Sequence, residues 1–133
     1  MKVLVDTPVW SLALRRRAQT PDDESLTREL EELLLDSRAA IVGIIRQELL
    51  SGISDKAVFT RLKNRLAILE DEEVIPEDYI KAAEYYNECR SKGIQGSVVD
   101  FLLCAVAARN DWEIFTTDKD FQHYAKHLPI GLR

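Results

Sequence analysis

The sequence contains few of the residues that mark several common classes of functional site. It has two cysteines and two histidines among 133 residues, which suggests no disulfide framework, and they lack the ligand spacing of a zinc site. Its five glycines form neither a G-x-G-x-x-G nor a G-x-x-x-x-G-K motif, so the common glycine-rich phosphate-binding loops are excluded. The sequence therefore indicates neither a disulfide-stabilised domain, nor a zinc site, nor a glycine-rich nucleotide site.

The sequence also lacks a long apolar run. No stretch approaches the roughly 18 residues that cross a bilayer, and the N-terminus enters a predicted strand without the apolar segment of a signal peptide. Hydrophobic residues make up 46% and charged residues 31% of the chain, the balance of a globular domain. We expect a single domain over residues 1–133, with no membrane partner and a location in the reducing cytoplasm.

Basic residues are outnumbered, 18 against 23 acidic residues, for a net charge of -5. This balance argues against a protein that coats nucleic acid through bulk positive charge. The balance is compatible with a nuclease, because acids gathered in a metal site lower the net charge while a local basic strip can still hold phosphates. Arg15, Arg16 and Arg17 form such a strip, or a solvated basic end of the first predicted helix, where cations suit the dipole.

Short β-type runs alternate with helical patterns along the chain. Strands are predicted at residues 2–5, 39–42, 73–75 and 113–116, with an edge strand at 128–132. Helices are predicted at residues 8–14, from about 20 to 36, and then at 44–50, 55–66, 76–93, 98–109 and through Tyr124. Alternation of this kind predicts an α/β fold, a three-layer sandwich in which helices flank a parallel central sheet of four to five short strands.

Helix starts and buried faces can also be predicted. Thr7 is expected to cap the first helix, and either Thr20 or Ser25 the second. Two later helices carry apolar residues at helical spacing. The predicted buried residues are Val58, Phe59, Leu62 and Leu66 in the first of these helices and Tyr79, Ala82, Ala83 and Tyr86 in the second.

Four acids stand at junctions that lie on one edge of such a sheet. Asp6 and Asp118 each follow a predicted strand, Glu48 lies on the helix after the second strand, and Asp100 lies in the first turn of an apolar helix. Because the carboxyl ends of parallel strands share one edge, the four carboxylates are predicted to line one pocket. Taken singly, each acid could be a helix cap or a surface charge, but the same placement occurs four times.

Four close carboxylates repel one another and raise one another's pKa, and a divalent cation relieves that repulsion. Oxygen ligands suit Mg²⁺ or Mn²⁺, which activates water and stabilises charge on phosphoryl oxygens. We therefore predict a small metal-dependent nuclease. Our hypothesis is that Asp6 and Asp100 are the principal ligands, while Glu48 and Asp118 hold a second ion or activate water.

Three alternatives to a nuclease use the same acids. They are another Mg²⁺-dependent phosphotransfer enzyme, a receiver-like domain, and a non-catalytic module that binds a cation or a partner peptide. A phosphatase of the haloacid dehalogenase type is disfavoured, because it needs a second Asp two residues after Asp6, where Pro8 stands.

Residues 5–10, 47–53, 99–105 and 116–121 together resemble the PIN-domain ribonucleases, and within them the VapC toxins of type II toxin–antitoxin modules. The resemblance implies Mg²⁺- or Mn²⁺-dependent endonucleolytic cleavage of RNA. By position, Asp6, Glu48, Asp100 and Asp118 match the family's acidic quartet, with Asp6, Asp100 and Asp118 as metal ligands. Thr116 matches its hydroxyl residue near the metal, and Asp120 and Thr7 are accessory candidates.

The resemblance also implies partners. VapC toxins commonly form homodimers and are held inactive by a small VapB-like antitoxin whose C-terminal segment covers the site. The family often has serine where this chain has Pro8, a difference that we expect to leave metal binding intact. Candidates for contacts to the RNA backbone are Arg15, Arg16, Arg17, Arg46 and Lys119.

Overall fold

A parallel sheet lies at the centre of the computed structural model, which describes residues 1–15 and 20–133. Its strands are β1 (Val3–Val5), β2 (Ala39–Ala40), β3 (Glu113–Phe115) and β4 (Gly131–Leu132). Their order is β2-β1-β3-β4, and every pair is parallel. The predicted α/β fold with a four-stranded parallel sheet is confirmed, and β1 is an inner strand with a neighbour on each side.

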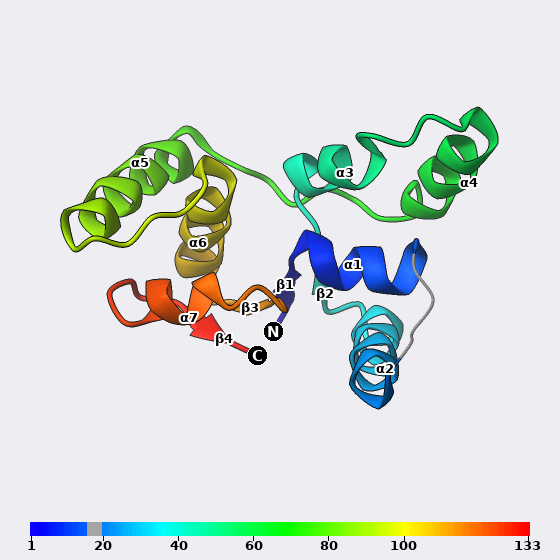
Figure 1. The fold of residues 1–133 in the computed structure, drawn as a ribbon, viewed down its shortest axis with the longest axis horizontal. Coiled ribbons are helices and arrows are strands. Elements are labelled where there is room, and N and C mark those ends of the chain that lie inside the picture. The colour runs from blue at the N-terminus through cyan, green and yellow to red at the C-terminus, as the bar shows by residue number, and fades with distance from the viewer. Residues whose placement is uncertain (16–19) are drawn as a thin grey trace.

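Seven helices flank this sheet in the described part of the chain (Figure 1). They are α1 (Thr7–Leu14), α2 (Pro21–Leu35), α3 (Gly43–Leu50), α4 (Lys56–Leu66), α5 (Pro76–Ser91), α6 (Val98–Asn110) and α7 (Asp120–Ala125). Figure 1 shows α5, α6 and α7 on one side of the strands and α1, α2 and α4 on the other. None of the described helices is long and apolar enough to span a membrane.

The strand predicted at residues 73–75 is wrong. The chain makes a single parallel bridge just before this segment, between Ile41 and Asp71. Ile75 instead caps α5, and its N–H donates to Asp78 Oδ2 at 3.0 Å. Because Pro76 has no N–H to offer a neighbouring strand, the chain turns into a helix where the β-type residues suggested pairing.

Helix caps differ from the prediction at one of two positions. Thr20 caps α2, and its Oγ1 accepts from the N–H of Asp23 at 3.1 Å. The cap of α1 is Asp6 rather than Thr7, because Asp6 is extended and its Oδ1 accepts from the N–H of Thr7 at 2.8 Å. Thr7 is therefore the first helical residue, which leaves its hydroxyl available for another partner.

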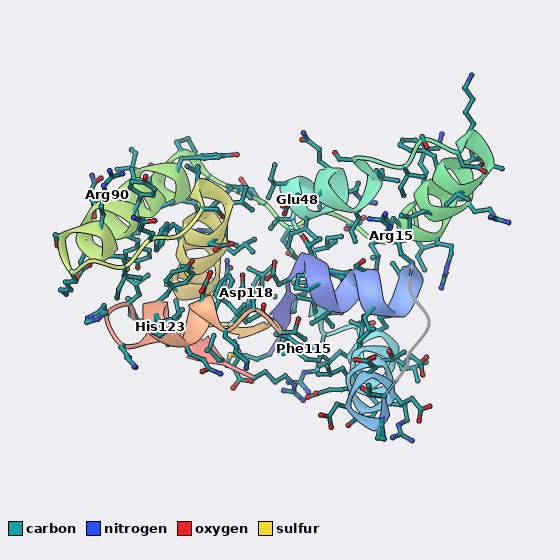
Figure 2. The ribbon with its side chains drawn as sticks, viewed as in Figure 1. Arg15, Glu48, Arg90, Phe115, Asp118 and His123 are labelled. Atoms are coloured by element: carbon teal, nitrogen blue, oxygen red, sulfur yellow. The ribbon has the colours of Figure 1, made fainter. Side chains whose placement is uncertain are left out.

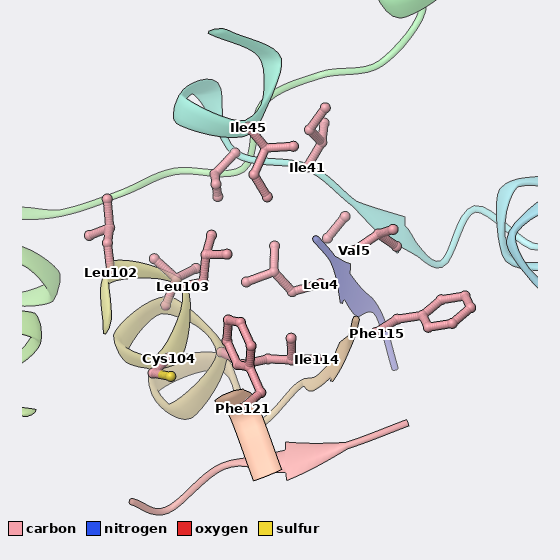
Figure 3. Close-up of a cluster of buried hydrophobic side chains, with 14 of the residues drawn as sticks. Leu4, Val5, Ile41, Ile45, Leu102, Leu103, Cys104, Ile114, Phe115 and Phe121 are labelled. Carbon is pink, nitrogen blue, oxygen red and sulfur yellow. The ribbon is translucent and has the colours of Figure 1, made fainter. Parts of the chain in front are cut away.

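The core joins the sheet to the most apolar helix of the chain. In α6, seven consecutive residues from 101 to 107 are buried. Figure 3 shows Leu103 and Cys104 of this helix close to Leu4 and Ile114 of the inner strands. Each fully buried large apolar side chain stabilises the fold by roughly 1.5–3 kcal/mol, so α6 and the residues at its start are held firmly against the sheet.

The predicted buried faces of two helices are partly wrong. In α4, Leu62 and Leu66 are buried, but Val58 is 38% and Phe59 36% exposed. In α5, Ala82 is buried as predicted, whereas Tyr79 is exposed, and the rest of the buried face consists of Asp78, Tyr85 and Cys89. Asp78 lies on this buried face and pairs with Arg109 at 2.7 Å, so a charged residue takes a core position.

Candidate functional site

Asp6 lies where the connections of the sheet change direction. The chain leaves β1 toward β2 on one side, and β3 and β4 lie on the other side. In open α/β sheets the crevice for a ligand forms at this point, outside the carboxyl ends of the strands. Asp6 is only 6% exposed, and its N–H donates to the carbonyl of Phe115 at 2.9 Å. The residue is thus fixed between the two inner strands.

Hydrogen bonds orient the Asp6 carboxylate. Its Oδ1 accepts from the N–H of Thr7 and its Oδ2 from Thr116 Oγ1, both at 2.8 Å. The same Thr116 hydroxyl oxygen accepts from the N–H of Asp118 at 3.0 Å. Thr116, predicted as an accessory residue, therefore links the acid after β1 to the acid after β3.

The other acids approach Asp6 from three further elements. Glu48 is exposed on α3, and its Oε1 accepts from Thr7 Oγ1 at 3.0 Å. Asp118 is exposed in the loop after β3, and its Oδ1 accepts from the N–H of Asp120 at 2.9 Å. Asp100 is partly buried in the first turn of α6. Figure 2 labels Glu48 and Asp118 on their separate elements.

These acids line one cleft of about 370 Å³. The structure thus brings together the four acids and Thr7, as the sequence predicted, and adds the buried Ser11. Ser11 lies four residues after Thr7 on α1, so helical spacing could have found it. Asp120, by contrast, does not line this cleft; only its backbone N–H reaches Asp118. The residues that line the cleft are Asp6, Thr7, Pro8, Ser11, Arg15, Glu48, Asp100 and Asp118.

The cleft concentrates negative charge in partly buried surroundings. Burial raises the pKa of the Asp6 carboxyl to about 6, against the lowering effect of its hydrogen bonds from Thr116 and Thr7, and the charges of Asp100 and Glu48 add to the rise. Burial also raises the pKa of Asp100, although Tyr124 donates a hydrogen bond to it. A bound cation would offset this charge without the need to protonate either acid.

The donor set fits a hard cation. Every acid and hydroxyl of the cleft offers oxygen, the ligand atom that Mg²⁺ and Mn²⁺ prefer, and no cysteine or histidine lines it. Within residues 1–15 and 20–133, no three acid, histidine or cysteine side chains already form a closed metal-binding group. The acids line the walls of the cleft, an arrangement suited to an ion that keeps several waters and also contacts substrate.

Replacing Thr116 with valine tests how the Asp6 carboxylate is held. Valine keeps the β-branched shape but removes a hydrogen bond to a charged group, worth about 1.5–3 kcal/mol. We expect the pKa of Asp6 to rise further above 6, because a contact that favours the charged form is lost. Carbon-detected NMR titration of the carboxyl groups measures this. The matched control is Thr117→Val at the adjacent exposed position, and an equal pKa in both variants would refute the assignment.

The basic residues predicted to contact the RNA backbone lie in different surroundings in the structure. Arg15 is exposed and lines the cleft, and Lys119 is exposed beside Asp118. Arg46 donates to Asp71 and to the carbonyls of Leu66 and Leu69 at distances from 2.7 to 3.0 Å, so its guanidinium serves the fold. Arg16 and Arg17 lie outside the described residues. Among the candidates that the structure describes, Arg15 is the one that lines the cleft.

A basic groove adjoins the acidic cleft. It has a volume of about 380 Å³, lies between α1 and α4, and is lined by Arg61 and Arg65 and by one acid, Asp55. Arg15 lines both the groove and the cleft. Sequence reasoning missed this surface, although α4 offered a signal: its eleven residues include Lys56, Arg61, Lys63 and Arg65 and no acid. The groove and the cleft therefore meet at Arg15.

Comparison with known proteins decides the family. The model of the PIN domain matches residues 3–127. The chain belongs to the PIN domain family. PIN domains are nucleases, so membership gives the general activity class of this chain. No curated protein matches the sequence significantly.

Several solved structures have a fold similar to that of this PIN domain. FitAcB from Neisseria gonorrhoeae is 19% identical, with a TM-score of 0.75 over 98% of this chain and 95% of that one. VapBC2 from Rickettsia felis, bound to a DNA fragment from its promoter, is 20% identical, with a TM-score of 0.76 over 100% and 98%. DNA-bound VapBC from Salmonella typhimurium is 16% identical, with a TM-score of 0.71 over 100% and 97%.

Proposed function

We propose that this PIN domain is a Mg²⁺- or Mn²⁺-dependent endoribonuclease and the VapC-type toxin of a type II toxin–antitoxin pair. The observation that carries the proposal is the buried Asp6 carboxylate, oriented by Thr116 and Thr7, in a cleft with three further acids. The similar structures FitAcB and VapBC support a VapB-like antitoxin as the partner. A homodimer is part of the proposal, and sedimentation equilibrium with and without antitoxin tests it.

The residues of the cleft have distinct proposed roles. Asp6, Asp100 and Asp118 would hold the cation, which supplies Lewis acidity and acidified water when bound. Thr116 and the N–H of Thr7 keep Asp6 in one orientation. Glu48 Oε1 accepts from Thr7, so we assign Oε2 as the oxygen that takes a proton from the attacking water. Arg15, at the edge of the cleft, would hold a phosphate of the substrate.

RNA cleavage by partner-free protein tests the proposal directly. A mixed pool of tRNA, rRNA and mRNA is incubated with Mg²⁺, Mn²⁺ or EDTA, and with protein carrying Asp6→Asn. Discrete fragments that require both the metal and Asp6 are the expected result. Asp111→Asn is the matched control, because Asp111 lies outside the cleft in the left-handed conformation that asparagine tolerates. Bound metal without cleavage in any tube would favour a binding module instead.

The basic groove predicts a salt-dependent contact with RNA. Arg61→Gln with Arg65→Gln removes two exposed cations of the groove, so RNA affinity should fall, and its dependence on salt should weaken by about 0.7 in slope per lost phosphate contact. Fluorescence anisotropy in EDTA separates binding from cleavage. Lys126→Gln removes an exposed charge away from the groove and is the control. An unchanged slope in the double variant would show that RNA does not lie there.

A further inference from the structure

Asp100 has a buried hydrogen-bond donor that the proposed site does not yet include. The hydroxyl of Tyr124 donates to Asp100 Oδ2 at 2.7 Å. Tyr124 is 0% exposed, whereas Asp100 lines the cleft. Tyr124 reaches the cleft through Asp100 and does not line it.

Aromatic packing fixes the Tyr124 ring. Its centroid lies 4.8 Å from that of Phe101 and 5.1 Å from that of Phe121. Phe101 directly follows Asp100 on α6, and Phe121 lies in the same helix as Tyr124. Such ring pairs prefer a restricted set of tilted or edge-on arrangements. The ring that carries the hydroxyl is therefore held against the same turn of α6 that carries the carboxylate.

Gly96 leaves the space that this hydroxyl occupies. A Cβ at Gly96 would lie 2.4 Å from the Tyr124 hydroxyl oxygen and 2.8 Å from Phe101 Cε2. The next residue, Ser97, caps α6, and its Oγ accepts from the N–H of Asp100 at 3.0 Å. The segment before α6 thus fixes the backbone of Asp100 and also makes room for the donor to its side chain.

We propose that Tyr124 is a positioning residue that holds the Asp100 carboxylate in the orientation required to bind the divalent cation, and that Gly96 makes this contact sterically possible. The inference rests on the proposed function in taking Asp100 as a metal ligand. Hydrogen-bond partners that orient metal ligands are commonly worth about 10- to 100-fold in metal affinity. A carboxylate fixed before the ion arrives loses less freedom on binding.

Tyr124→Phe tests the inference, because it removes only the hydroxyl. We expect Mn²⁺ to bind about tenfold more weakly in calorimetry, with the circular dichroism spectrum unchanged. Cleavage should need more Mg²⁺ but approach the wild-type rate at saturating metal. A general loss of structure would instead lower the rate at saturating metal as well. The matched control is Tyr86→Phe, whose ring packs on Phe101 at 5.7 Å and whose hydroxyl accepts from Arg90 instead.

Gly96→Ala perturbs the same contact without removing the hydroxyl. It should also weaken Mn²⁺ binding, and adding Tyr124→Phe should weaken it little further, because both changes disrupt one hydrogen bond. Wild-type affinity in Tyr124→Phe, or an equal loss in Tyr86→Phe, would overturn the inference. Wild-type protein that binds Mn²⁺ but cleaves no RNA would refute the proposed function alone, whereas wild-type protein that binds no Mn²⁺ would refute both.

Discussion

Replacing Asp6 with asparagine should reduce metal-dependent RNA cleavage by about a thousandfold or more, because a negative ligand worth several kcal/mol of transition-state stabilisation is lost. The fold should persist. Asparagine caps helices as well as aspartate does, and its side-chain oxygen can still accept from the N–H of Thr7. Cleavage is measured under single-turnover conditions with saturating Mg²⁺ or Mn²⁺.

The same substitution should stabilise the metal-free protein at high pH. The pKa of Asp6 rises from 3.8 to about 6 on folding, so the folded state favours the protonated form. The favourable contribution of the protonated Asp6 carboxyl to folding stability is therefore fully present below pH 3.8 and is lost as the pH rises through 6. Above that pH the buried charge opposes folding by up to about 3 kcal/mol, and asparagine carries no such charge.

Urea denaturation in EDTA at pH 4, 6 and 8 measures this effect. The difference between Asp6→Asn and the wild type should be small at pH 4 and largest at pH 8. Added Mn²⁺ should then stabilise the wild type but not the variant, because only the wild type retains the full ligand set. Full cleavage activity in Asp6→Asn would refute the site, and Asp111→Asn should match the wild type in both assays.

The proximity of Asp6 and Asp118 was predictable because the topology of a parallel sheet fixes it. Asp6 and Asp118 follow strands, and short apolar runs mark those strands in the sequence itself. Once the strands are parallel, their carboxyl ends share an edge. The order and approximate bounds of the helices were also readable from caps and apolar spacing, as at Thr20, whose side chain accepts from the N–H of Asp23.

Contacts between distant elements were not predictable in the same way. Tyr124 meets Asp100 across 24 residues, and the basic groove needs α4 to pack beside α1. The rotation of each helix depends on tertiary packing, so a helical repeat fixes the set of possible faces but not the one that is buried. Asp78 shows this most clearly, since its partner Arg109 is 31 residues away and makes a charged core position tolerable.

Breaking that pair should have the largest effect on stability. Asp78 is 2% exposed, and Arg109 donates to its two carboxylate oxygens at 2.7 and 3.0 Å. Arg109→Met keeps much of the side-chain volume but leaves a buried carboxylate with only the N–H of Ile75. Removing one partner of a buried ion pair commonly costs about 3–5 kcal/mol. We expect a loss of about 2 kcal/mol at pH 7, because Ile75 still donates to Asp78 and because the Arg109 side chain is 35% exposed, so solvent screens part of the interaction.

The pH dependence of that loss identifies its cause. Burial acts to raise the pKa of the Asp78 carboxyl, but the hydrogen bonds from Arg109 and Ile75 outweigh it and hold the pKa below the usual value of 3.8. The pair therefore stabilises the wild type above pH 3.8 and loses this effect as the pH falls through the lowered pKa. The loss in Arg109→Met should accordingly shrink under acid.

Urea denaturation at pH 7 and pH 3 measures the loss in Arg109→Met, with Arg90→Met, an exposed arginine on α5, as control. A loss that is equal at both pH values would assign the effect to packing of the Arg109 side chain instead. Arg109 lies at the C-terminal end of α6 and Asp100 at its start. If Arg109→Met is destabilised but binds Mn²⁺ with wild-type affinity, the contact between α6 and α5 does not influence metal binding at the other end of α6.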